Sequence, residues 1–217
     1  MTVISVNDVS LSFGARELFK NISFSLETND RLGIVGPNGC GKSTLLSLLL
    51  RENKPFFLPS FSDEIHYEAE IVVRICKMGK NISQKFAPRY YDAVALGIDF
   101  TARDLQRKFK EQGSPWELCK GFDNSAPVSE FVPKEQFADI NNLQFHLDLN
   151  KETVQQGNTK DMIFKIDEII EYASKFFTLK VGDLIFTGTP AGVGKVSVGD
   201  RLEGYIEDRK LIDFEIA

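Results

Sequence analysis

The sequence has few cysteines, no excess of basic residues and no long apolar run. Its cysteines, Cys40, Cys76 and Cys119, are odd in number and lack CxxC spacing, which argues against a disulfide framework and against a zinc site. The 26 Lys and Arg against 31 Asp and Glu give a net charge of -5, which argues against nucleic acid or an anionic membrane as partner. Neither a signal peptide nor a membrane span is apparent. These absences favour a soluble, cytoplasmic protein.

What is present is a series of short strands with few helices. Hydrophobic residues make up 42% of the 217 residues, enough to bury a core. Alternating apolar residues predict strands over 143–149 and 181–189 and a closing hairpin over 198–206 and 211–216. A helix capped by Thr159 is expected to pack on the sheet. Its apolar positions are Met162, Ile163, Ile166, Ile169, Ile170, Ala173, Phe176 and Phe177. The pattern predicts a mostly β α+β fold, a barrel or roll with a few packing helices.

An acidic strand over 64–75 stands out among these elements. Read with a period of two, it places apolar residues on one face and Glu64, His66, Glu68 and Glu70 on the other. Side chains two apart on one face lie within roughly 7 Å of each other, so two ionised glutamates repel unless a cation lies between them. A hard divalent metal ion would relieve that repulsion. The alternative is a half-buried strand whose polar face meets water.

The next strand, over 90–100, brings a further carboxylate. Asp99 shares its face with small residues, which leaves it room to reach a ligand. A helix expected from Ala102 carries Gln106, and Lys120 follows a break at 113–116. Without further information, Lys120 is equally well a solvated loop lysine, and Gln106 is more often a helix-surface residue.

The first 52 residues have a different character. Segments 4–13 and 22–26 alternate like a hairpin, and a short apolar strand then leads into a GxxxxGK[ST] loop over 36–44. In such a loop the glycines let backbone N–H groups face a phosphate, the lysine adds positive charge, and the hydroxyl can ligate magnesium. The residues of this candidate nucleotide site are Gly36, Gly41, Lys42, Ser43 and Thr44.

Segments 6–14 and 32–46 together resemble the opening of an ABC-transporter-type ATPase domain. The resemblance implies that Phe13 would stack on the adenine of ATP. It stops near Arg51, and neither an LSGGQ-like signature nor a Walker B carboxylate follows. ATP binding without productive hydrolysis is therefore one hypothesis, and a phosphate loop stranded without its partners is the other.

From about residue 53 onward the chain resembles the fumarylacetoacetate hydrolase family. Five blocks carry the resemblance in the family's order, at 66–70, 99–106, 114–123, 156–164 and 182–194. The resemblance covers about three-quarters of the chain. It implies that Glu68, Glu70 and Asp99 bind Mg²⁺ or Mn²⁺ and that Gln106 and Lys120 contact the substrate in the catalytic site. It further implies that Thr189 holds the substrate carboxylate, and that the protein is a homodimer.

The chemistry of these residues agrees with such a site. Three monodentate carboxylates on an octahedral cation leave three positions, which suits a 2-oxo acid binding through two oxygens plus one water. The metal and Lys120 can stabilise the enolate that forms beside the ketone. We therefore expect a metal-dependent enzyme for acylpyruvates or related 2-oxo acids, acting by carbon–carbon hydrolysis, decarboxylation or keto–enol isomerisation.

One departure from the family concerns a His–Glu dyad on a lid segment that activates water for hydrolysis. The only histidines, His66 and His146, do not precede the acidic strand, and the ABC-like block occupies the place of the lid. We expect two domains, 1–52 and 53–217, joined as a fusion or chimera. Loss of a positioned base typically costs roughly 10²–10⁴-fold in rate, so hydrolysis is expected to be impaired. A weakened enzyme that serves as a scaffold is the remaining alternative.

Overall fold

The structure is a computed structural model that describes residues 2–13, 16–27 and 54–217. The chain divides into two compact units, Met1–Arg51 and Glu52–Ala217. In the first unit, strands β1 (Thr2–Phe13) and β2 (Arg16–Glu27) pair antiparallel, which confirms the hairpin expected there. The phosphate-loop residues at 36–44 and the side chain of Phe13 lie outside the described residues, so the nucleotide hypothesis stays a prediction.

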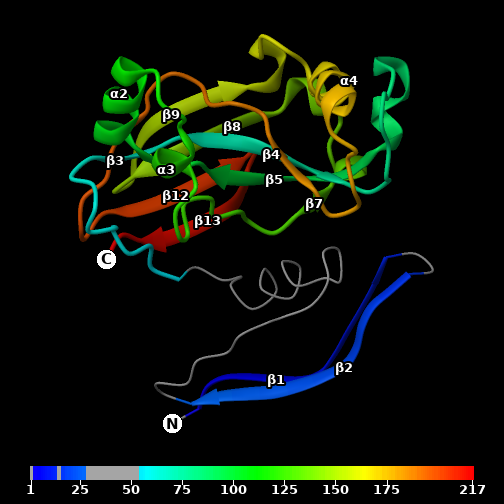
Figure 1. The fold of residues 1–217 in the computed structure, drawn as a ribbon, viewed down its shortest axis with the longest axis horizontal. Helices are drawn as coiled ribbons and strands as arrows, with labels where there is room; N and C mark the ends of the chain where they lie inside the picture. The colour runs from blue at the N-terminus through cyan, green and yellow to red at the C-terminus, as the bar shows by residue number, and fades with distance from the viewer. Residues whose placement is uncertain (1, 14–15, 28–53) are drawn as a thin grey trace. The chain divides into compact units, whose positions relative to one another are not determined.

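The second unit is built from three small sheets and a few helices (Figure 1). The first sheet has the order β10-β4-β5-β7, with β10 Leu184–Phe186, β4 Ala69–Ile75, β5 Tyr91–Ile98 and β7 Val132–Pro133. The second has the order β11-β3-β6, with β11 Gly194–Lys195, β3 Ile65–Tyr67 and β6 Thr101–Ala102. The third has the order β13-β12-β8-β9, with β13 Arg209–Glu215, β12 Arg201–Ile206, β8 Gln144–Leu149 and β9 Glu152–Asn158. This arrangement confirms the mostly β α+β fold and the closing hairpin.

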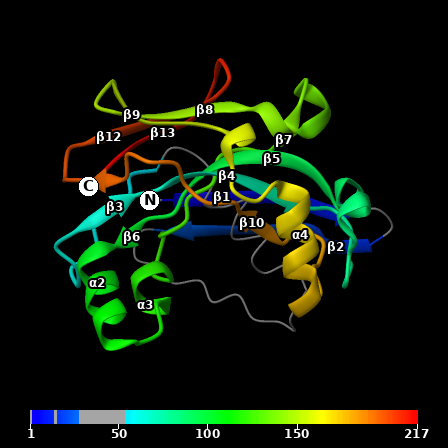
Figure 2. The same ribbon diagram turned by 90° about the horizontal axis from the view of Figure 1, so that it is seen from above.

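Helices connect and cover these sheets. The α-helices are α2 (Arg103–Gln112), α3 (Glu117–Lys120) and α4 (Ile166–Phe176). The 3₁₀ turns are η1 (Gln84–Arg89), η2 (Lys134–Gln136), η3 (Ile140–Asn142) and η4 (Thr159–Asp161). Seen from above, α2 and α3 lie together at one end of the unit and α4 lies at the other (Figure 2). No helix among the described residues combines the length and apolar character needed to cross a bilayer.

The core runs along β4 and β5, whose side chains are buried on both faces. Six consecutive residues of β5, from Ala93 to Ile98, are buried. Phe100, which follows β5, stacks on Phe56 with ring centroids 3.9 Å apart and meets Phe214 edge-on at 6.3 Å. Burial on both faces, with a helix and other sheets on either side, makes this pair of strands the most constrained part of the fold.

The acidic strand differs from its prediction. It breaks at Glu68 into β3 and β4, which belong to different sheets, so no single half-buried strand spans 64–75. The pairing register is nevertheless the same on both sides of the break, because His66 pairs with Thr101 and Ala69 pairs with Ile98. Glu68 therefore stands opposite Asp99, and the Asp99 amide donates to the Glu68 carbonyl at 2.8 Å.

The cap predicted at Thr159 is wrong. Thr159 begins the 3₁₀ turn η4, and its buried hydroxyl donates to the Ile140 carbonyl and accepts from the Leu143 amide. Asn158 caps the turn, while α4 starts at Ile166. The side chain of Thr159 thus ties two loops together instead of starting a helix.

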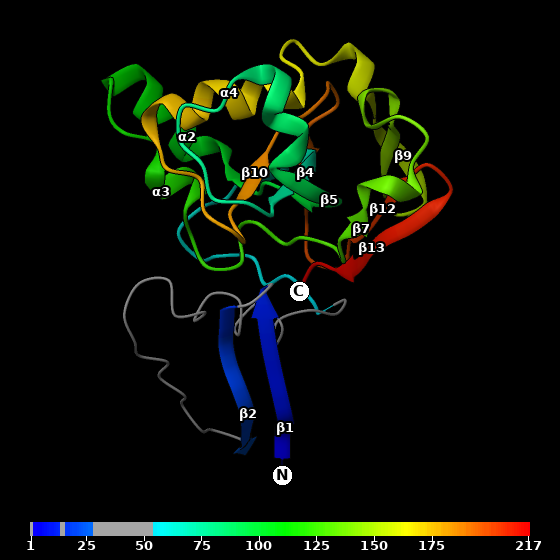
Figure 3. The same cartoon turned by 90° about the vertical axis from the view of Figure 1, so that its right-hand side faces the viewer.

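The expected packing of the α4 region is only partly correct. Ile166 and Ile170 are buried against the core. Ile163, Phe176 and Phe177, which the pattern also placed on the sheet, are 91%, 61% and 68% exposed. The helix has apolar residues on more of its circumference than the sheet can cover, and Figure 3 shows it on the outside of the unit beside β10.

The core analysis predicts the effect of truncating Phe100. The variant Phe100→Ala should lower the free energy of unfolding by about 3–5 kcal/mol, because a fully buried stacked ring leaves a cavity. The measurement is chemical denaturation followed by circular dichroism. Phe57→Ala is the matched control, since Phe57 is 68% exposed and its loss should change stability by no more than about 0.5 kcal/mol. Equal losses in both variants would contradict this account of the core.

Candidate metal centre

Three carboxylates meet at the junction of the first two sheets. One oxygen from each of Glu68, Glu70 and Asp99 lies within 4.8 Å of the other two. Glu68 is 9% and Glu70 5% exposed, and Asp99 is half-buried. The sequence predicted that these residues converge, and the structure brings them together. Their donor atoms are all oxygens, as hard divalent cations prefer.

The pairing of the strands explains the convergence. Glu68 and Asp99 face each other across the register, and Glu70 lies two residues further along β4, opposite Gly97. A Cβ atom at Gly97 would lie 2.6 Å from the Val72 side chain and 2.7 Å from that of Phe186, so only glycine fits there. The Gly188 amide donates to Glu70 Oε2 at 2.7 Å and holds that carboxylate in place.

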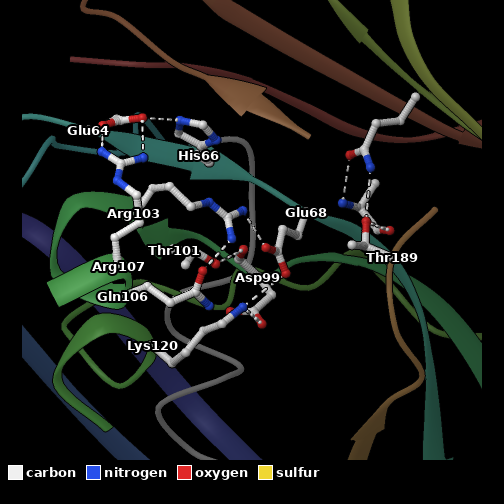
Figure 4. A network of polar contacts seen from close by, with 12 residues as sticks. Glu64, His66, Glu68, Asp99, Thr101, Arg103, Gln106, Arg107, Lys120 and Thr189 are labelled. Carbon is white, nitrogen blue, oxygen red and sulfur yellow. Dashed lines mark hydrogen bonds and ion pairs between the residues drawn. The ribbon is translucent and has the colours of Figure 1, made fainter. Parts of the chain in front are cut away.

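Two basic side chains contact this acidic cluster (Figure 4). Lys120, at the end of α3, places Nζ 2.9 Å from Glu68 Oε2 and 2.6 Å from Asp99 Oδ2. Arg103, at the start of α2, donates to Glu68 Oε1 at 2.5 Å and to Gln106 Oε1 at 2.6 Å. Both residues predicted from the sequence thus lie at the cluster. Lys120 contacts the carboxylates directly, and Gln106 is linked to Glu68 through Arg103.

The pKa values of the three acids shift in different directions. Burial acts to raise the pKa of Glu68, but hydrogen bonds from Lys120 and Arg103 outweigh it and hold that pKa below its usual value. Burial raises the pKa of Glu70 to about 7, and the charges of Asp99 and Glu68 add to the rise. Burial also raises the pKa of Asp99, although Lys120 opposes the shift. Glu70 therefore keeps a proton near neutral pH that a bound cation would displace.

Lys120 remains charged in this setting. Burial alone would lower its pKa, but the hydrogen bonds and charges of Asp99 and Glu68 raise it above the ordinary lysine value. The ammonium group therefore acts as a fixed positive charge and hydrogen-bond donor at the edge of the carboxylates.

Thr189 lies in a turn that is fastened to β4. Its hydroxyl donates to the Ala69 carbonyl at 2.8 Å and accepts from Gln155 Nε2 at 2.9 Å. The Thr187 hydroxyl donates to the Ile71 carbonyl in the same way. Because its proton already has an acceptor, the Thr189 hydroxyl would have to exchange that bond to hold a substrate carboxylate, and this role stays a prediction.

Sequence reasoning missed two residues of the centre, Arg103 and Gln155. Arg103 could have been found, because it lies one helical turn before Gln106 and shares its face. Gln155 gave no signal. It is buried in β9, and its side chain accepts from the Ala69 amide at 2.9 Å while donating to Thr189 and to the Pro190 carbonyl.

Neither histidine belongs to the cluster formed by Glu68, Glu70 and Asp99. His66 Nε2 is 3.0 Å from Glu64 Oε1, and Arg107 holds the Glu64 carboxylate from the other side (Figure 4). Burial lowers the pKa of His66, and the charge of Arg103 lowers it further. His146 stacks on Tyr205 in the third sheet, with ring centroids 4.5 Å apart.

Comparisons with known proteins show which family this chain is similar to. The family model for the fumarylacetoacetate (FAA) hydrolase C-terminal region matches residues 44–217, beginning at the last residue of the candidate nucleotide site. Mitochondrial oxaloacetate tautomerase FAHD1 of Mus musculus is 42% identical over 165 residues, 76% of this chain and 75% of that protein. Oxaloacetate tautomerase YcgM of Escherichia coli is 43% identical over 150 residues, 69% of this chain and 68% of that protein.

A solved structure gives a similar result. The crystal structure of fumarylpyruvate hydrolase from Pseudomonas aeruginosa, in complex with Mn²⁺ and pyruvate, superposes with a TM-score of 0.73 at 36% identity. The match covers 76% of this chain and 71% of that one. The family model, which matches residues 44–217, spans the part of the chain that holds the three carboxylates.

The raised pKa of Glu70 predicts how the metal-free protein responds to pH. The folded state binds the Glu70 proton more tightly than the unfolded state, so stability should fall as pH rises from 4.5 to about 7. In Glu70→Gln this part of the loss should disappear. The measurement is the melting temperature between pH 5 and 8 in the presence of a chelator. Glu130→Gln, at an exposed position, is the control, and a slope equal to wild type in Glu70→Gln would contradict the assignment.

Proposed function

The chain belongs to the fumarylacetoacetate hydrolase family, and on that premise we propose that it is a divalent-metal-dependent enzyme acting on short 2-oxo acids. The observation that carries the proposal is the meeting of Glu68, Glu70 and Asp99 within 4.8 Å, with Lys120 against two of them. The relatives named as oxaloacetate tautomerases and a fumarylpyruvate hydrolase support the same class of substrate.

The residues fit a hard cation such as Mg²⁺ or Mn²⁺. Glu68 and Glu70, which are buried, and Asp99, which is half-buried, would supply oxygen ligands and a charge that retains the ion, and an octahedral ion would keep further positions for substrate and water. When bound, the ion supplies Lewis acidity toward the substrate's 2-oxo and carboxylate oxygens. The Mn²⁺ in the Pseudomonas aeruginosa relative supports a divalent ion, and we propose Mg²⁺ or Mn²⁺ without choosing between them.

Lys120 is the group we place next to the reacting oxygen. When a proton leaves the carbon beside the ketone, negative charge develops on the 2-oxo oxygen. The Lys120 ammonium has three N–H donors, and the two carboxylates receive two of them. The remaining donor can stabilise that charge, and its fixed position means that little reorganisation is needed.

Arg103 and Gln106 orient the rest of the substrate. Gln106 Oε1 accepts from Arg103, which fixes the amide so that its NH₂ group is free to donate to a carboxylate. Arg103 presents a planar fork of donors beside the same place. A dicarboxylic 2-oxo acid has a second carboxylate for these groups, and Thr189 is the proposed contact for the first.

Among the three reactions expected for the family, we propose keto–enol tautomerisation of an oxaloacetate-like acid as the main one. Tautomerisation needs only removal and return of a proton on a carbon that two carbonyl groups already acidify. Carbon–carbon hydrolysis needs, in addition, a water molecule activated by a positioned base. Two tautomerases among the relatives favour the simpler reaction, and hydrolysis or decarboxylation is proposed to be slower.

We also propose that residues 1–52 and 53–217 form separate domains. The division of the chain into compact units after Arg51 supports this boundary. ATP binding by Gly36–Thr44 stays a sequence prediction. It is tested by the rise in melting temperature on adding ATP, compared between wild type and Lys42→Ala. A rise that Lys42→Ala abolishes would assign ATP binding to this loop and not to the metal site.

Replacing the carboxylates should remove cation binding. Glu68→Gln, Glu70→Gln and Asp99→Asn should each abolish the stabilisation by Mn²⁺, which at about a hundred times the dissociation constant adds roughly 2.7 kcal/mol to wild type. Thermal unfolding with and without Mn²⁺ measures this. Glu130→Gln, outside the cluster, should keep the full shift. Retention of the shift in Glu70→Gln and Asp99→Asn would refute the assignment.

Removal of the Lys120 charge should separate catalysis from metal binding. Lys120→Met should lower kcat for oxaloacetate tautomerisation by roughly 10²–10³-fold, because one donor to the developing oxyanion is lost. The reaction is followed by the ultraviolet absorbance of the enol. Mn²⁺ binding should persist in the variant, and Lys110→Met, exposed in the last turn of α2, should behave as wild type. A variant with unchanged kcat would exclude Lys120 from the reaction.

A further inference from the structure

Helix α2 carries two groups of the proposed substrate site, but it has little apolar contact with the rest of the unit. None of its residues is buried, and Leu105 and Phe109 reach the core while staying partly exposed. Ala102, which precedes the helix, has no side-chain oxygen to cap it. Because a helix in a protein is held mainly by its packed apolar face, other contacts have to fix the positions of Arg103 and Gln106.

Such contacts come from the segment that leads into β3. Asp104 accepts hydrogen bonds from the Ser62 hydroxyl at 2.6 Å and from the Asp63 amide at 3.1 Å. The Ser62 hydroxyl in turn accepts from the Glu64 amide at 3.3 Å. The Arg103 amide donates to the Glu64 carbonyl at 2.8 Å. The first turn of α2 is therefore tied to this segment through both side chains and backbone.

A second tie lies one helical turn further along α2. The Arg107 guanidinium donates to both carboxylate oxygens of Glu64, and His66 Nε2 approaches the same carboxylate at 3.0 Å (Figure 4). The hydrogen bonds from Arg107 lower the pKa of Glu64 to about 2, so this carboxylate is ionised at neutral pH. A paired fork of this kind fixes direction as well as distance. Arg103 lies four residues before Arg107 on the same side of α2, so the fork also fixes Arg103.

We propose that three residues, Ser62, Glu64 and Asp104, are positioning residues for the substrate site, and we call them the α2 clamp. The clamp holds Arg103 and Gln106 where they meet the second carboxylate of a dicarboxylic 2-oxo acid. The inference rests on the proposed function, since that carboxylate is what the two side chains would bind. The strands β4 and β5 hold the metal centre independently of α2, so loss of the clamp should weaken substrate binding and spare the metal site.

The first test measures the clamp itself and needs no substrate. In the full-length protein, the double variant Ser62→Ala/Glu64→Gln should speed amide hydrogen exchange in α2 by about 5-fold or more, because the helix loses hydrogen bonds that hold it closed. Mass spectrometry of peptides from α2 gives the rate, and peptides from β5 should exchange as in wild type. Lys108→Gln, exposed on the same helix, is the control. Unchanged exchange in α2 of the double variant would overturn the clamp, whatever the protein acts on.

The second test asks whether the clamp serves the second carboxylate. Glu64→Arg and Arg107→Glu should each raise KM for oxaloacetate by roughly 10-fold and change kcat by no more than about 2-fold, because donors to that carboxylate are displaced while the metal centre stays in place. KM for acetylpyruvate, a 2-oxo acid without the second carboxylate, should stay as in wild type. The double variant Glu64→Arg/Arg107→Glu restores the pair with its charges exchanged and should return KM for oxaloacetate toward the wild-type value.

The matched control is Lys108→Glu, which makes the same charge change as Arg107→Glu at an exposed position of α2. An equal rise of KM for both acids, or a double variant without rescue, would assign the ion pair to general stability and overturn its positioning role. A wild-type protein that accelerates the tautomerisation of neither acid would refute the proposed function, and the exchange measurement would then still decide whether the clamp holds α2.

Discussion

The site depends on one pair of residues, Glu68 and Asp99, which face each other across antiparallel strands. Two like charges in this position repel strongly, and burial makes the repulsion worse. Two cations offset this repulsion. The Lys120 ammonium lies within 2.9 Å of both carboxylates, and Arg103 donates to the other oxygen of Glu68. Arg103 begins α2 and Lys120 ends α3, so these two helices deliver the two cations to that pair.

The backbone around the acids is equally specific. Glu68 lies at the break between β3 and β4, and Glu70 follows two residues later in β4, so the two carboxylates reach the same cluster. A glycine opposite Glu70 and an amide from Gly188 complete the surroundings of that carboxylate. Buried acids with opposed pKa shifts in one cluster are typical of functional sites, and here the strand pairing produces them directly.

The sequence predicted which residues form the metal centre, but it did not predict how the strands are arranged around them. The period-two pattern identified Glu68 and Glu70, and the family's motifs added Asp99, Gln106 and Lys120. The break between β3 and β4 was missed because the apolar alternation continues through it without interruption. Gln155 was missed because a single buried glutamine in a strand has no pattern of its own. The pattern in α4 overestimated burial, since periodicity shows which residues avoid water but not what covers them.

Gln155 has a consequence for the mechanics of the fold. It belongs to the sheet of β8 and β9, yet its single amide group bonds the backbone of Ala69 in β4 of the neighbouring sheet and also the turn that holds Thr189. The side chain of Gln155 therefore joins the two sheets at Ala69, the residue between Glu68 and Glu70. Sliding of one sheet over the other has to break these hydrogen bonds, which lie beside the carboxylates that would hold the cation.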